Sequence, residues 1–176
     1  MARRRSAKSL VAWRRRAIER MGRSRAATLR LLARMPEEVL RRPRTQGEWS
    51  IKDVLTHIAG WEEEGTRRLK LIARGRGDRV VWYETMADAD RFNARAVRAG
   101  RRLGPRALLR RLARARADLV RALSRVPPWA LGDPGAGLPV TVWLREFAWT
   151  HEGAHRQEIR EWGRAQRARR ASIGRR

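Results

Sequence analysis

Apolar residues in this chain recur at steps of three and four positions, which is the spacing of one face of an α-helix. The recurrence stops at four places that contain proline or paired glycines, namely Met35-Pro36, Gly75 to Gly77, Gly104-Pro105 and Pro127-Pro128. No convincing strand pair or internal repeat accompanies it. The spacing predicts an all-α chain with helices over residues 6–34, 50–75, 85–102, 105–125 and 140–166.

Local sequence signals support several of these helix boundaries. Ser50 with Asp53 forms one predicted capping box, and Thr85 with Asp88 forms another. Pro105 suits the first position of a helix. Four main helices, one shorter helix and the long connections 36–49, 76–85 and 127–140 suit a four-helix bundle with crossover links. We expect one domain over residues 1–166 and a basic, disordered tail over 167–176.

Residues 76–85 contain the apolar segment Val80-Val81-Trp82-Tyr83. This segment could be a short extended piece or a lid over a pocket. The sequence does not decide between the two.

The composition excludes several classes of protein and site. The chain has no cysteine, which rules out disulfides and thiolate metal ligands. It has no apolar run of about 18 residues, so we expect no membrane span. The basic start is not followed by the apolar segment of a secretory signal, and a cytoplasmic location is the default expectation.

The net charge of +25 comes from 43 Lys and Arg against 18 Asp and Glu, and nearly all of the basic residues are Arg. A nucleic-acid partner is the usual reading of such a charge. The arginines are spread along every predicted helix instead of forming one stripe, which favours solvated helix faces. We expect non-specific adhesion to nucleic acid at low salt. Apolar helix faces could also support a homodimer.

The three histidines form a predicted metal site. His151 and His155 are four residues apart, so they share one helical face with Cβ atoms about 6 Å apart. Their neighbours on that face are apolar, as are the neighbours of His57 on the second long helix. Three imidazoles from two helices would leave open coordination positions, as in catalytic zinc sites. Imidazole also suits nickel, iron or cobalt.

Three segments resemble the DinB/YfiT-like superfamily of metalloenzymes. Residues 47–61, GEWSIKDVLTHIAGW, look like its signature around the first histidine. Residues 90–93, DRFN, resemble an element that follows the second helix in one branch, the ClbS/DfsB group of colibactin self-resistance type proteins. Residues 151–159, HEGAHRQEI, are similar to the closing His-x-x-x-His of the superfamily. The elements occur in the expected order over nearly the whole chain.

The resemblance implies a DinB-like bundle with up-down-down-up connectivity and a divalent metal, zinc or nickel, held by His57, His151 and His155. The superfamily includes thiol-dependent S-transferases and a mycothiol-dependent isomerase, and the nearer branch includes a hydrolase that opens an electrophilic cyclopropane. A resemblance to a superfamily is better evidence for a shared fold and a shared metal site than for a shared activity.

We therefore expect the protein to be a metal-dependent enzyme of detoxification or stress type that acts on a small electrophile. A metal could lower the pKa of a bound water, or could bind an external low-molecular-weight thiol. Glu64 and Glu158 share the histidine faces, so each could be a general base or a partner of a ligand. Solvated carboxylates paired with arginine are the alternative for both.

A second set of residues could line a substrate pocket. It comprises Glu48, Trp49, Trp61, Trp82 and Asn93, although the three tryptophans could equally fill the core. Two further hypotheses stay open. The protein could sequester a toxin or protect nucleic acid through its basic surface, or the metal could be purely structural.

Overall fold

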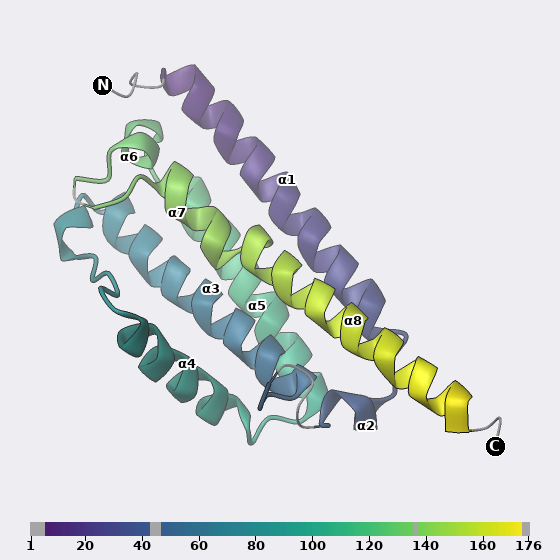
Figure 1. The fold of residues 1–176 in the computed structure, drawn as a ribbon. Helices are drawn as coiled ribbons and strands as arrows, with labels where there is room; N and C mark the ends of the chain where they lie inside the picture. The colour runs from purple at the N-terminus through teal and green to yellow at the C-terminus, as the bar shows by residue number, and fades with distance from the viewer. Residues whose placement is uncertain (1–5, 43–46, 136, 174–176) are drawn as a thin grey trace.

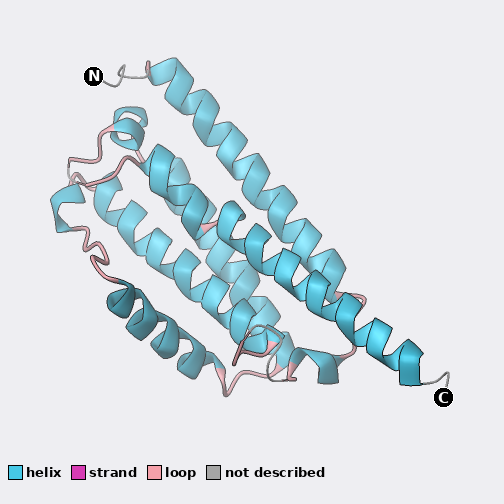
Figure 2. Ribbon diagram, viewed as in Figure 1, coloured by secondary structure: helices cyan, strands magenta, loops and turns pink. Residues whose placement is uncertain are grey.

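The computed structural model describes residues 6–42, 47–135 and 137–173. The long helices are α1 (Ala7–Leu32), α3 (Ile51–Ala73), α5 (Pro105–Arg125) and α8 (Trp149–Ile173). Between them lie α4 (Met86–Gly100) and α7 (Val140–Phe147), with the short α2 (Glu37–Leu40), α6 (Pro128–Gly132) and the 3₁₀ turn η1 (Gly77–Arg79). No strand occurs in the described ranges (Figure 2), so the all-α prediction is confirmed.

Four rods of helix form the bundle, with α7 and α8 making one of them end to end. Figure 1 shows α1 and the α7–α8 rod running in one direction and α3 and α5 running in the other. The chain order is therefore up-down-down-up, as the resemblance implied. The shorter α4 packs along the outside of α3, antiparallel to it, and makes the crossover to α5 possible.

The predicted capping signals are present in the structure. The hydroxyls of Ser50 and Thr85 each accept a hydrogen bond from the backbone N–H three residues later. The carboxylates of Asp53 and Asp88 each accept one from the backbone N–H of Ser50 and Thr85, respectively. Pro105 is the first residue of α5. These caps set the starts of α3, α4 and α5 to within one residue of their predicted positions.

Two apolar clusters fill the bundle, one towards each end. The first gathers around Met21, Leu69, Leu119 and Leu144, and the second around Ile51, Leu55, Leu112 and Ile159. Every one of these side chains is at most 1% exposed. The two clusters do not merge into one continuous apolar core, because charged residues lie between them.

Those charged residues are Arg25, Glu62, Arg116 and Glu152, one from each long helix. Both carboxylates are 0% exposed and both arginines are 7% exposed. Arg25 donates to Glu62 at 2.8 Å and to Glu152 at 2.7 Å, and Arg116 donates to Glu62 at 2.9 Å and to Glu152 at 2.8 Å. Each cation therefore binds both anions, which offsets the cost of burying four charges.

The pKa values of the two buried carboxyl groups, Glu62 and Glu152, are shifted in opposite directions. Burial raises the pKa of Glu62 in spite of the neighbouring arginines. Burial acts on Glu152 in the same direction, but Arg25 and Arg116 outweigh it and lower the pKa of that carboxyl. Glu152 also lies in the first turn of α8, where the helix dipole favours a negative charge.

One predicted long helix is divided into two in the structure. Residues 140–166 were expected to form a single helix, but α7 ends at Phe147 and α8 begins at Trp149. The break occurs at Ala148, whose φ of −129° and ψ of −101° are not helical. Alanine is the best helix former, so no local signal predicts this break.

Several smaller differences concern the connections. The predicted connections 36–49, 76–85 and 127–140 contain α2, η1 and α6, each five residues or shorter. The last helix continues to Ile173, beyond its expected end at residue 166. Residues 174–176 of the expected tail lie outside the described ranges. Among the helices described, none is both long and apolar enough to pass through a bilayer.

Candidate metal centre

His57 lies in the second turn of α3, on the face that packs against α8. Its side chain is 4% exposed. The indole of Trp49, just before the Ser50 cap, lies 4.9 Å from the His57 ring, and the indole of Trp61, one turn later, lies 6.3 Å away. The capping box thus fixes a helix start that buries the imidazole between two indoles.

His151 and His155 follow one another on the first two turns of α8. The Nε2 atom of His151 lies 2.8 Å from Nε2 of His57 and 3.1 Å from Nε2 of His155. One nitrogen from each of the three residues lies within 4.8 Å of the others. The histidines that the sequence placed on inward faces do converge on one point.

The electrostatics keep the imidazoles of His57 and His151 neutral. Burial, followed by the proximity of His151 and His155, lowers the pKa of His57 to about 3. Burial and His155 lower the pKa of His151 to about 4. Neutral imidazole is the form that binds metal, so both rings keep a nitrogen lone pair at neutral pH.

The geometry fits a divalent ion better than a hydrogen-bond chain. A neutral ring nitrogen carries either one hydrogen or one lone pair, so Nε2 of His151 cannot satisfy both of its Nε2 neighbours. A cation placed among the three nitrogens would satisfy all three lone pairs at once. The absence of cysteine restricts the donors here to nitrogen and oxygen.

Glu158 lies beside the site, one turn after His155. Its Oε2 atom lies 3.0 Å from Nδ1 of His155. This contact holds the ring with Nε2 facing the other histidines, which is the usual role of a carboxylate behind a ligand. The Nδ1 atoms of His57 and His151 are buried and have no hydrogen-bond partner among the described residues.

Glu64 occupies a different environment from that of Glu158. Its carboxylate accepts hydrogen bonds at 2.8 Å from both Arg67 and Arg68. Burial would raise its pKa, but these two arginines outweigh burial and lower it. The carboxylate of Glu64 is therefore bound by two guanidinium groups in the middle of α3.

The five predicted pocket residues lie in three different surroundings. Trp49 and Trp61 lie against His57, and Trp61 donates from Nε1 to Oδ1 of Asn93 at 3.0 Å. Trp82 lies elsewhere, with its ring 5.9 Å from that of Trp143 and covered by the guanidinium of Arg68. Glu48 is exposed. Trp82 is therefore part of the core cluster, and Trp49, Trp61 and Asn93 surround the histidines.

The loop 76–85 contributes a residue that the sequence did not single out. The ring of Tyr83 lies 5.5 Å from that of Trp61, which in turn lies 6.4 Å from the His151 ring. Arg68, 1% exposed, holds the loop by stacking under Trp82 and Tyr83. Tyr83 therefore lies on the aromatic side of the site, and the lid interpretation of this loop stays a prediction.

The family model for the DinB superfamily matches residues 7–159. The chain belongs to the DinB superfamily. No curated protein and no solved structure matches it. The match covers all three histidines, and it is to the superfamily as a whole, so closeness to the ClbS/DfsB branch stays a prediction.

In this DinB protein an open cleft of about 700 Å³ leads to the histidines. His155 and Glu158 line it, together with Trp49, Glu161 and Trp162. Its size lies within the range typical of small-molecule sites. The cleft would give a substrate access to the side of the site that His155 faces.

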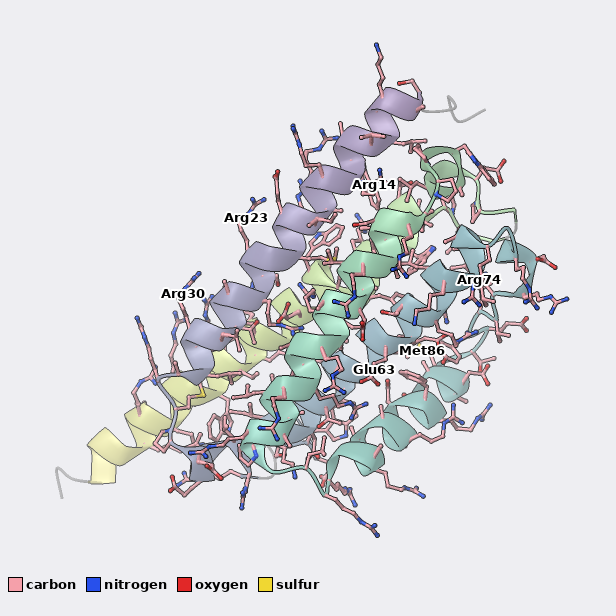
Figure 3. The ribbon with its side chains drawn as sticks, turned by 180° about the vertical axis from the view of Figure 1, so that it is seen from behind. Arg14, Arg23, Arg30, Glu63, Arg74 and Met86 are labelled. Atoms are coloured by element: carbon pink, nitrogen blue, oxygen red, sulfur yellow. The ribbon has the colours of Figure 1, made fainter. Side chains whose placement is uncertain are left out.

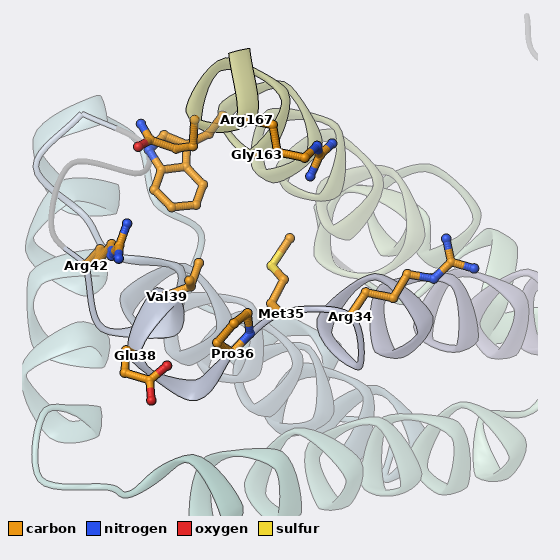
Figure 4. Close-up of a pocket in the computed structure, with 10 residues that line it drawn as sticks. Arg34, Met35, Pro36, Glu38, Val39, Arg42, Gly163 and Arg167 are labelled. Carbon is orange, nitrogen blue, oxygen red and sulfur yellow. The ribbon is translucent and has the colours of Figure 1, made fainter. Parts of the chain in front are cut away.

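A smaller hollow of about 230 Å³ lies at the same end of the bundle, between the end of α1, α2 and the end of α8. Figure 4 shows Met35 and Val39 on its inner side, with Arg34, Arg42 and Arg167 around it. Trp162 lines this hollow as well as the cleft. No histidine is among the described residues that line it, so the cleft is the better candidate for substrate.

Proposed function

We propose that this protein is a metal-dependent enzyme that acts on a small electrophile, by thiol transfer or by hydrolysis. The observation that supports this most strongly is the convergence of three imidazole Nε2 atoms, from His57, His151 and His155, beside an open cleft. Zinc or nickel is the divalent ion that we propose for the site, on the basis of the imidazole donors.

The residues around the histidines have separable roles in this proposal. A bound divalent ion supplies Lewis acidity, which lowers the pKa of a coordinated water or thiol. Glu158 holds His155 in position and can accept a proton at its carboxylate, because it also faces the cleft. Trp49 and Trp61 exclude water from one side of His57. Glu64, bound by two arginines, supports the fold of α3.

The thiol and hydrolysis routes differ in what must be supplied. The chain has no cysteine, so a sulfur nucleophile has to come from an external low-molecular-weight thiol. Hydrolysis needs only water and a base, and Glu158 is the carboxylate placed closest to the cleft and the histidines together.

An activity screen tests the proposal. Metal-loaded protein is incubated with a panel of electrophiles, with and without a small thiol, and loss of electrophile is followed by mass spectrometry. We expect turnover by the wild type and its loss in His151→Ala, and dependence on the thiol separates transfer from hydrolysis. Equal rates for wild type and His151→Ala would contradict a metal-dependent reaction.

The alternative is a protein that sequesters a toxin or protects nucleic acid through its basic surface. Figure 3 shows arginine side chains projecting from α1, α4 and α5, including Arg23 and Arg30 on the outer face of α1. DNA binding that is lost at high salt and survives replacement of all three histidines would favour this alternative. The spread of the arginines over several faces, without one continuous stripe, makes it the weaker candidate.

A further inference from the structure

The cleft beside the histidines differs in charge from the rest of the molecule. The chain has 43 Lys and Arg residues and a net charge of +25. Yet none of the described residues that line the cleft is a lysine or arginine, and two of them, Glu158 and Glu161, are carboxylates. The adjacent hollow, which shares Trp162, shows the opposite character, with Arg34, Arg42 and Arg167 around it.

The apolar part of the cleft is aromatic. Trp49 and Trp162 both line it, and both pack against the apolar cluster around Leu55 and Ile159. Their inner sides are thus held by the core while the cleft remains open between α8 and the start of α3. Held indole rings offer flat surfaces for stacking, and their faces attract cations.

The two carboxylates are held at the cleft by contacts on α8. Glu158 contacts His155, as described above, and Glu161 accepts a hydrogen bond from Gln157 Nε2 at 2.8 Å. In the part of the chain that the structure describes, neither carboxylate contacts a lysine or an arginine. A positively charged ligand would therefore meet two negative charges and two indoles at the entrance to the histidine cluster.

We propose that this cleft selects substrates that carry a planar aromatic group and a positive charge, such as a protonated or quaternary aromatic amine. The proposal rests on the proposed function for what happens next at the histidines, and it adds the substrate class. Most of the surface repels cations, so the cleft is a local exception that concentrates them at one place. Anionic substrates, which the net charge attracts everywhere, are disfavoured at this site.

Binding of a defined probe tests the selection. N-methylquinolinium is titrated into the full-length protein by calorimetry at about 0.15 M salt, where long-range effects of the net charge are screened. A neutral N-methylquinolone serves as the uncharged counterpart. We expect the cation to bind more tightly than the neutral compound, and equal affinity for the two would overturn the proposal.

Two variants and one matched control locate the binding. Glu161→Gln removes a charge from an exposed position, and we expect it to weaken cation binding about threefold while leaving the neutral compound unaffected. Trp162→Leu should weaken the binding of both compounds, by about fivefold for the cation. Glu38→Gln is the control, because Glu38 lines only the adjacent hollow. If Glu38→Gln weakens binding of the cation and Glu161→Gln does not, the cleft is not the binding site.

The metal content of the same samples separates this inference from the proposed function. A wild type that takes up no metal but shows the cation preference and the Glu161 effect would contradict the enzyme and leave the cleft assignment standing. A wild type that takes up metal but shows no cation preference would overturn only the substrate class. Circular dichroism of Trp162→Leu checks its fold, and Glu161→Gln carries the test if that variant is unfolded.

Discussion

The Oε2 atom of Glu158 lies 3.0 Å from the Nδ1 atom of His155, one helical turn earlier on α8. This contact orients the imidazole that lines the cleft towards the other two. We predict that Glu158→Ala weakens the affinity for zinc by about tenfold, because the ring loses the partner that fixes it. Competition with a chromophoric chelator measures the change.

Glu161→Ala is the matched control for this measurement. Glu161 lies on the same helix and lines the same cleft, but it accepts its hydrogen bond from Gln157 and not from a histidine. We expect it to keep the wild-type zinc affinity. Equal losses in both variants would indicate a general effect of charge, and not orientation of His155.

The buried charges between the two apolar clusters predict a large effect on stability. Glu152→Ala leaves Arg25 and Arg116 sharing one carboxylate in the centre of the bundle. We expect a loss of about 3–5 kcal/mol in the free energy of unfolding, measured with urea, because a buried charge loses its partner. Glu146→Ala, at an exposed position of α7, should change stability by less than about 0.5 kcal/mol. Similar values for the two variants would contradict the network.

The packing of α4 against α3 depends on a close approach at Gly100. A Cβ atom there would lie 2.2 Å from Cγ2 of Thr56, so Thr56 or the helix would have to move. We predict that Gly100→Ala destabilises the protein by about 1–3 kcal/mol. Gly22→Ala provides the comparison, because no atom lies within 4 Å of a Cβ placed there and alanine is the better helix former. A gain of stability in both variants would show that the α3–α4 contact is loose.

The ion pairs of Glu64 predict a dependence on pH. Arg67 and Arg68 lower the pKa of Glu64 in the folded state, although burial opposes them. Because the pKa is lowered in the folded state, the contribution of Glu64 to the free energy of unfolding is fully present above the unfolded pKa of about 4.5. This contribution is lost as the pH falls through the pKa of Glu64 in the folded state. The urea midpoint of Glu64→Gln should lie below that of the wild type at pH about 7, and the gap should narrow at pH about 3. A gap that is constant across this range would contradict ionic pairing.

Much of the fold follows from local signals in the sequence. The capping boxes at Ser50 and Thr85 and the proline at position 105 act within one helical turn, so they could be read directly. The histidine cluster was predictable for the same reason, because the four-residue spacing of His151 and His155 and the apolar neighbours of His57 are local patterns.

The remaining features depend on contacts between distant segments. The break at Ala148 places a strong helix former outside the helical region, which only the packing of α7 and α8 can impose. The charge network needs one residue from each of four helices. A hint existed on α3, where Leu55, Glu62 and Leu69 recur at seven-residue steps and place a carboxylate on an apolar face. Its partners could not be identified without the fold.

The position of Glu64 shows why a shared helical face is a weak guide to chemistry. Seven residues after His57 it lies on the same side of α3, but two turns along the axis take it away from the histidines and towards Arg67 and Arg68. Glu158, only three residues from His155, remains within hydrogen-bond distance.

Metal stoichiometry tests the central claim most directly. Protein purified without a histidine tag is loaded with zinc or nickel, desalted and analysed for metal, together with His151→Ala, whose Nε2 atom lies between those of His57 and His155. The three-histidine site predicts about one metal ion per chain in the wild type and less than about a tenth of that in the variant. The same metal content in both proteins, or none in the wild type, would contradict it.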